Sequence, residues 1–192
     1  VTFVHDSNET PRAALPAIDE TFERVTLRKE ELPAVPREEL AALEAFMREG
    51  YRIDRFHSDL RLPAERSDAL YVAWFRKVFD GSWADGAQAL RRDGRYVGFC
   101  SFQHAARVAS EFAGPSIIGR GLAAVLPEAR GGYAVLTRMI HTRCPFGSRF
   151  QEFDTQLQNF PTIRVWIQEG MRFVRARITL HRWLDERFPG GG

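Results

Sequence analysis

The chain has 192 residues, of which 44% are hydrophobic and 27% charged, and its formal net charge is +2. These values fit a folded chain with a sizeable core and exclude disorder as the default state. The positive surplus is too small to indicate nucleic-acid binding, which usually requires a clustered basic face. Cys100 and Cys144 lie far apart, so they predict neither a disulfide framework nor a zinc knuckle and favour a reducing compartment.

Nothing in the sequence indicates a membrane segment. The longest apolar run, 122–126, is too short to span a bilayer, and the first residues lack the basic-then-apolar start of a signal peptide. We therefore expect a cytoplasmic protein without a membrane or nucleic-acid partner. Residues 1–20 show no periodicity and predict a loose lead-in to a single domain at 21–188.

Two helical patterns follow a first strand, predicted at 22–27 from alternating apolar and polar residues. The first helix begins after Pro36 and ends at Gly50. The second begins at Pro63, because proline is favoured in the first turn of a helix. Its predicted buried stripe consists of residues at helical spacing, namely Leu70, Trp74 and Val78.

A β-hairpin is predicted where the runs 86–92 and 95–103 meet at Asp93-Gly94. Asp-Gly between alternating segments is a strong short-range hairpin signal, because both residues tolerate a positive φ. A further strand pattern covers 107–112.

The rest of the chain alternates strands with helices. Strands are predicted at 117–126, 150–157 and 173–183. Helices are predicted at 133–143, where Tyr133, Leu136 and Ile140 would be buried, and at 159–169. These elements predict an α/β (α+β) protein whose mixed, mostly antiparallel central sheet is flanked by helices.

The segment from Gly121 to Met139 carries the main functional signal. A buried strand stops at Pro127, and Arg130-Gly131-Gly132 leads directly into an amphipathic helix. Backbone N–H groups at such a helix N-terminus form an anion site, and glycine lets a phosphate approach the backbone. The alternative is an ordinary strand-to-helix turn.

A second motif overlaps this turn. Gly119-x-Gly121-x-x-Ala124 satisfies the dinucleotide-binding fingerprint as a string. That fingerprint must open a helix, whereas here it runs into an apolar stretch that ends at Pro127. We therefore reject it.

The pattern Val125-x-Pro127-x-x-Arg130-Gly131 resembles the acetyl-CoA pyrophosphate loop of the GNAT N-acetyltransferases, shortened by one residue. A second segment, 155–173, resembles the part of these enzymes in which a strand ends at asparagine, here Asn159, and a helix follows. The resemblance implies a GNAT acyl-CoA acyltransferase fold, with an acceptor-side half at 21–115 and an acetyl-CoA half at 116–188. It also implies a set of cofactor-binding residues: Ala124, Val125, Leu126, Arg130, Gly131, Gly132, Tyr133, Ala134, Asn159 and Trp166.

One departure from the family bears on mechanism. Many GNAT enzymes place a tyrosine seven residues after the asparagine to protonate the departing CoA thiolate, and here Trp166 stands in its place. An indole N–H donates hydrogen bonds but is no practical proton source near neutral pH. Either solvent or another residue supplies the proton, or the chain binds CoA without turnover.

The acceptor side resembles sugar-nucleotide amino-sugar acetyltransferases of the dTDP-fucosamine type, through Arg55-Phe56, Leu70-Tyr71-x-x-Trp74 and His181-x-Trp183. The substrate-binding candidates are Arg55, Trp74, Arg175 and Arg177. Two arginines on one face of the last predicted strand would suit a diphosphate, or they would simply face solvent.

The attacking amine must lose a proton, so a base is expected. The histidine and carboxylate candidates are His57, Asp59, His104, Glu111 and His181. Of these, His181, His57 and Asp59 are taken as the catalytic candidates, although a lone histidine is often only a packing residue. No residue set has metal-ligand spacing, so no metal is expected.

The sequence therefore predicts an acetyl-CoA-dependent N-acetyltransferase that acts by direct attack in a ternary complex. The expected partners are a small-molecule amine, with a sugar nucleotide as one candidate, and a second copy of the chain in a homodimer. A CoA-binding sensor or scaffold without turnover and a protein or peptide N-acetyltransferase remain as alternatives. An acidic acceptor groove would favour the peptide over a nucleotide-linked sugar.

Overall fold

The computed structural model describes residues 1–6, 21–50, 52, 54–104, 117–142 and 148–178. A seven-stranded sheet has the order β2-β3-β4-β5-β6-β1-β7. Neighbouring strands of this sheet pair antiparallel, except for β5 and β6, which are parallel. The strands are β1 (Thr2–Asp6), β2 (Glu23–Arg28), β3 (Gly86–Arg92), β4 (Arg95–His104), β5 (Ile117–Val125), β6 (Phe150–Asp154) and β7 (Arg172–Arg175).

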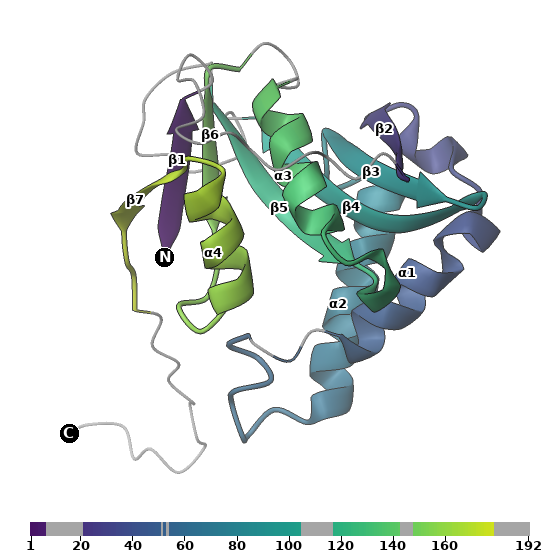
Figure 1. Ribbon diagram of the computed structural model, residues 1–192. Helices are drawn as coiled ribbons and strands as arrows, with labels where there is room; N and C mark the ends of the chain where they lie inside the picture. Colours follow the sequence, from purple (N-terminus) through teal and green to yellow (C-terminus); the bar gives the residue numbers. More distant parts are fainter. Residues whose placement is uncertain (7–20, 51, 53, 105–116, 143–147, 179–192) are drawn as a thin grey trace.

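Helices cover both faces of this sheet (Figure 1). On one face lie α1 (Arg37–Glu49) and α2 (Ala64–Phe79), and on the other lie α3 (Gly132–Thr142) and α4 (Phe160–Gln168). Short 3₁₀ helices occupy Leu32–Ala34 and Pro127–Ala129. Among the described residues, no helix has both the length and the apolar character that crossing a bilayer requires. The predicted α/β class with a mostly antiparallel sheet is confirmed.

The hairpin of β3 and β4 turns at Asp93 and Gly94, as predicted, with φ of 52° and 76°. Positive φ at both central residues produces a turn whose twist matches that of the flanking strands. Strand β6 stops at Asp154, short of the predicted end at 157. The predicted strand at 107–112 lies outside the described residues, as does the last predicted strand beyond residue 178.

The expectation of a loose lead-in is wrong for the first residues of the chain. Thr2 to Asp6 form β1, which lies between β6 and β7 and pairs with both. Phe3 is buried, with its ring centroid 5.4 Å from that of Trp166. Because its partner strands lie about 150 residues away, no local pattern identified it.

The buried face of α2 also differs from the prediction. Val78 is buried as predicted, but Leu70 is 41% exposed, and the helix also buries Ser67, Tyr71, Val72, Phe75 and Phe79. Both stripes have helical spacing, and the packed one contains the larger aromatic area. Phe75 and Phe79 meet Phe99 of β4 at ring-centroid distances of 5.3 and 5.4 Å.

The parallel pair β5 and β6 opens toward one end of the sheet. The two strands pair only through Ile117, Ile118 and Gly119 of β5, although β5 continues to Val125. Beyond Gly119, β5 pairs with β4 alone among the described strands. The two strands therefore diverge after Gly119. In the described part of the chain, the edge of β5 that faces β6 is left without a partner strand from there to Val125.

Candidate active site

Two adjoining cavities lie at this divergence. One, of about 190 Å³, contains residues from the α1–α2 connection, α2, β5 and α4, and we call it the acceptor cavity. The other, of about 450 Å³, lies between the end of α1, the end of β5 and α4, and we call it the cofactor cavity. The residues that line both are Ala123, Tyr133, Asn159 and Thr162. The gap between the strands is thus one continuous cleft with two ends.

The backbone of β5 directs a donor toward this cleft. The N–H of Leu122 donates to Ser101 Oγ (2.9 Å) and that of Leu126 to Val97 O (2.9 Å), so both point toward β4. Successive N–H groups of a strand point to opposite edges. The N–H of Val125 therefore points toward the edge that β6 has left, and Val125 lines the cofactor cavity.

The turn into α3 forms a helix N-terminus next to the end of β5. The N–H groups of Ala134 and Val135 donate to Gly131 O, so the N–H groups before them precede the first intrahelical bond. Gly131 is exposed with φ +89°, and no atom lies within 4 Å of the position a Cβ would occupy. An anion can approach this backbone closely, and the exposed Arg130 precedes it.

Gly132 has a different reason to be glycine. It is buried, and a Cβ there would meet Leu90 Cδ1 at 2.9 Å and Val125 Cγ1 at 3.2 Å. The second glycine of the turn therefore lets α3 pack closely on β3 and β5. Only Gly131 of the pair is exposed for phosphate contact.

Asn159 and Trp166 both belong to the lining of the cleft. The Asn159 side chain makes no capping hydrogen bond to α4, and its Nδ2 donates to Thr155 Oγ1 (3.0 Å). The Trp166 ring is 1% exposed and packs between Phe3 and Phe153. Trp166 therefore contributes mainly to the core beneath the cleft.

Aromatic and acidic side chains gather in the acceptor cavity. Tyr71 and Trp74 stack with a centroid distance of 6.2 Å, and Asp54 and Asp154 add carboxylates. Burial, followed by the charge of Asp54 and a hydrogen bond with it, raises the pKa of Tyr71, so the phenol stays protonated. No arginine or lysine among the described residues lines this cavity. It is suited to a cation.

Trp74 Nε1 is an unusual donor in this cavity. It is buried and has no hydrogen-bond partner among the described residues. A buried indole N–H without a partner carries a desolvation cost. A ligand oxygen placed in the cavity would remove that cost.

Comparisons with known proteins bear on the fold. No protein-family model matches the sequence, and no curated protein matches it. The aminoglycoside N-acetyltransferase AAC(6')-Iy in complex with CoA matches with a TM-score of 0.54 and 16% identity, over 88% of this chain and 98% of that chain. AAC(6')-Ih from Acinetobacter baumannii matches with a TM-score of 0.54 and 11% identity, over 85% and 99%. This chain has the GNAT fold.

Within the GNAT fold, His57 does not lie in the cleft lining. Its Nε2 is 2.9 Å from Asp68 Oδ1, and its Nδ1 is bonded to Asp54 Oδ2. Burial opposes protonation, but the hydrogen bonds with Asp68 and Asp54 outweigh it and raise the pKa of His57. With a carboxylate on each ring nitrogen, His57 has both nitrogens occupied and is poorly placed to remove a proton from an amine.

The other base candidates lie elsewhere. Asp59 accepts the Arg61 N–H (3.0 Å) outside both cavities. The backbone N–H of His104, at the end of β4, donates to Asp85 (2.8 Å). Glu111 and His181 lie outside the described residues.

The three candidate arginines do not line the two cavities either. Arg55 lies over the Phe56 ring at 4.7 Å. Arg175 forms an ion pair with the buried Glu152 (3.3 Å), and Arg177 is exposed beyond β7. The structure thus places Trp74 and five of the ten cofactor candidates in the cleft lining, namely Ala124, Val125, Tyr133, Asn159 and Trp166, but separates them from the predicted arginine-rich face.

Sequence reasoning missed Asp54, Tyr71 and Asp154 of the acceptor cavity. Each lies in or beside a segment that the sequence did identify. None has a spacing that distinguishes it from a surface carboxylate or a core aromatic, so only the fold reveals that they converge.

Proposed function

We propose that the protein transfers an acetyl group from acetyl-CoA to the amine of a small cationic molecule, by direct attack in a ternary complex. The observation that carries this proposal is the cleft between β5 and β6, where two cavities meet beside a strand edge bearing the Val125 N–H. The GNAT fold supports it.

The cofactor end is assigned from the residues present. The Val125 edge of β5, with Ala124 and Asn159, would lie along the acyl-CoA arm, and Arg130, Gly131 and the N-terminus of α3 would receive its pyrophosphate. The Val125 N–H would donate to the thioester oxygen as negative charge develops there.

The reaction forms a C–N bond and breaks the C–S bond. The ammonium of the acceptor gives up two protons in all, one of which ends on the CoA thiol and the other in solvent. Of the residues shared by both cavities, Tyr133 is the one with an ionisable side chain, so we assign it as the proton donor to the thiolate. Trp166 does not need that role.

The acceptor end favours a hydroxylated amine that is cationic. Asp54 and Asp154 attract positive charge and would repel the diphosphate of a sugar nucleotide. The Tyr71 and Trp74 faces suit an ammonium, and the buried Trp74 Nε1 suits a substrate hydroxyl. An amino sugar without a nucleotide combines these properties, as do the aminoglycosides named for the structural neighbours.

A thiol-release screen with acetyl-CoA tests the proposal. The panel contains aminoglycosides, simple amino sugars, polyamines, sugar nucleotides and peptides. Release with the cationic small amines is expected. Turnover of peptides alone, which the acidic lining also permits, would overturn the acceptor class, and CoA binding without any release would favour the sensor or scaffold. If calorimetry shows no CoA binding at millimolar ligand, the whole proposal fails.

A further inference from the structure

The connection between α1 and α2 contributes a wall to both ends of the cleft. Arg52 lines the cofactor cavity and Asp54 lines the acceptor cavity. These residues precede a tight turn in which the Ser58 N–H donates to Asp54 O (3.1 Å). Whatever holds this connection in place therefore sets the geometry at both ends.

One carboxylate oxygen on α2 holds it at two points. Asp68 Oδ1 lies 2.8 Å from Arg52 Nη1 and 2.9 Å from His57 Nε2. His57 in turn binds Asp54 through Nδ1. Arg52, in the cofactor cavity, and Asp54, in the acceptor cavity, are thus both fixed through Asp68.

Acidic and basic side chains alternate along the hydrogen-bonded chain of Asp54, His57, Asp68 and Arg52. Asp54 Oδ1 also accepts the backbone N–H groups of Phe56 (2.7 Å) and His57 (3.0 Å), so the carboxylate has a fixed orientation. The His57 side chain is 7% exposed, and its ring stacks on that of Tyr71 at 5.9 Å. The hydrogen bond with His57 lowers the pKa of Asp68, and Arg52 reinforces this. A buried imidazole held between two carboxylates is a rigid element, because removing either partner leaves a buried polar group without its hydrogen bond.

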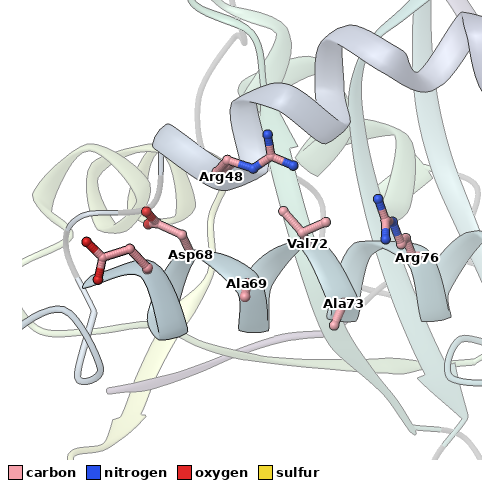
Figure 2. Close-up of a pocket in the computed structure, with 7 residues that line it drawn as sticks. Arg48, Asp68, Ala69, Val72, Ala73 and Arg76 are labelled. Atoms are coloured by element: carbon pink, nitrogen blue, oxygen red, sulfur yellow. The ribbon is translucent and has the colours of Figure 1, made fainter. Parts of the chain in front are cut away.

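We propose that Asp68 is a positioning residue for the transfer reaction: it holds Arg52 at the cofactor end and, through His57, holds Asp54 at the acceptor end. This inference rests on the proposed function. Asp68 acts from outside the cleft, since it lies in an outer groove of about 570 Å³ between α1 and α2. Figure 2 shows Asp68 on α2 with Val72 and Arg76, and Arg48 reaching across from α1.

The outer groove supplies a matched control. Glu65 lines the same groove one helical turn before Asp68, but among the described residues no hydrogen bond or ion pair joins it to His57 or Arg52. Asp68→Asn and Glu65→Gln each remove one negative charge from the groove. Only Asp68→Asn removes a charge from the hydrogen-bonded chain that leads through His57 to Asp54.

Steady-state kinetics with acetyl-CoA and an active amine compare these variants. For Asp68→Asn we expect the KM of both substrates to rise and kcat/KM to fall about 10-fold, the usual size for a weakened charge-assisted hydrogen bond. Glu65→Gln should stay within about 2-fold of the parent, as surface substitutions usually do. Thermal unfolding of each variant shows whether the protein is folded at the assay temperature.

The pH dependence separates positioning from general stability. The pKa of His57 is raised above the 6.5 of the free side chain, so its stabilising effect is complete below pH 6.5 and is lost as pH rises through the folded value. The groups facing the ring are Asp54, Asp68 and Tyr71, with Arg52 beyond Asp68. We expect both the melting temperature and the affinity for CoA to decline as pH rises through that value, and His57→Gln to abolish the decline.

The outcomes are distinct. If Asp68→Asn matches Glu65→Gln in both KM values and in the pH profile, or if it only lowers the melting temperature, Asp68 has no positioning role and this inference is wrong, while the proposed function stands. If the parent protein neither binds CoA nor releases thiol with any amine, the proposed function fails. The melting-temperature profile of His57→Gln still reports on the His57 contacts in that case.

Discussion

The two edges of β5 differ sharply. One edge is paired with β4 over most of its length, from Ile118 opposite His104 to Val125 opposite Gly98. The other is paired with β6 only through Ile117, Ile118 and Gly119. The same strand is therefore an interior strand at its start and an open edge at its end.

This difference shows where the cleft originates. An unpaired strand edge inside a protein is costly unless another group satisfies it, and in most sheets such edges are covered or blunted. Here the open edge lines both cavities, so it is available to a ligand. The paired edge supports it, because β4 fixes the direction of each N–H in β5.

The largest effect is expected on the free energy of unfolding, when a contact between β4 and the paired edge of β5 is removed. Ser101 is fully buried; its Oγ accepts the Leu122 N–H (2.9 Å) and donates to Leu122 O (3.0 Å) at the register shift between β4 and β5. Ser101→Ala leaves both groups unsatisfied and should lower the free energy of unfolding by about 2–4 kcal/mol.

Chemical denaturation measures this loss. Ser67→Ala is the matched control, because Ser67 is also buried but its Oγ has no partner among the described residues. Equal losses for the two variants would show that Ser101 does not support the paired edge.

Probing the open edge should change catalysis rather than stability. Tyr133→Phe removes the assigned proton donor and should lower kcat about 100-fold with little change in either KM. With an acetyl thioester of an acidic aromatic thiol, whose thiolate needs no protonation, the defect should vanish.

Tyr71→Phe serves as the comparison, since Tyr71 lines only the acceptor cavity. Its defect should be independent of the leaving group. A Tyr133→Phe defect that persists with the acidic thiol would assign the proton to another source.

The smallest effect is expected for a substitution at the end of β6, on the other side of the cleft from β5, and it should appear in the KM of the amine. Asp154 accepts Thr2 Oγ1–H (2.5 Å) and lines the acceptor cavity, but the residue is exposed, so its charge is screened. Asp154→Asn should raise the KM of a cationic amine about 3-fold and reduce its sensitivity to salt. Asp93→Asn, which removes the same charge at the distant β3–β4 turn, should change neither.

Local signals predicted most elements, because hairpin chemistry, proline starts and hydrophobic periodicity act over a few residues. Asp93-Gly94 and Pro63 are examples, and Val125, Gly131 and Asn159 of the cleft were found through short motifs. Local signals failed for β1, whose partners are distant in the chain, and for Leu70, where two helical stripes competed.

The sequence by itself determined most of the strands and helices, though not β1, and the exposed glycine turn that follows β5, since these depend on neighbouring residues. Only the tertiary structure decided where β5 and β6 separate and which charged side chains meet there. Asp54, Asp68 and Asp154 come from three separate segments, and the pKa of His57 is raised because Asp54 and α2, which carries Asp68, place a carboxylate on each ring nitrogen. Charge and pairing depend on distances in space, and those are set when the sheet and its helices pack together.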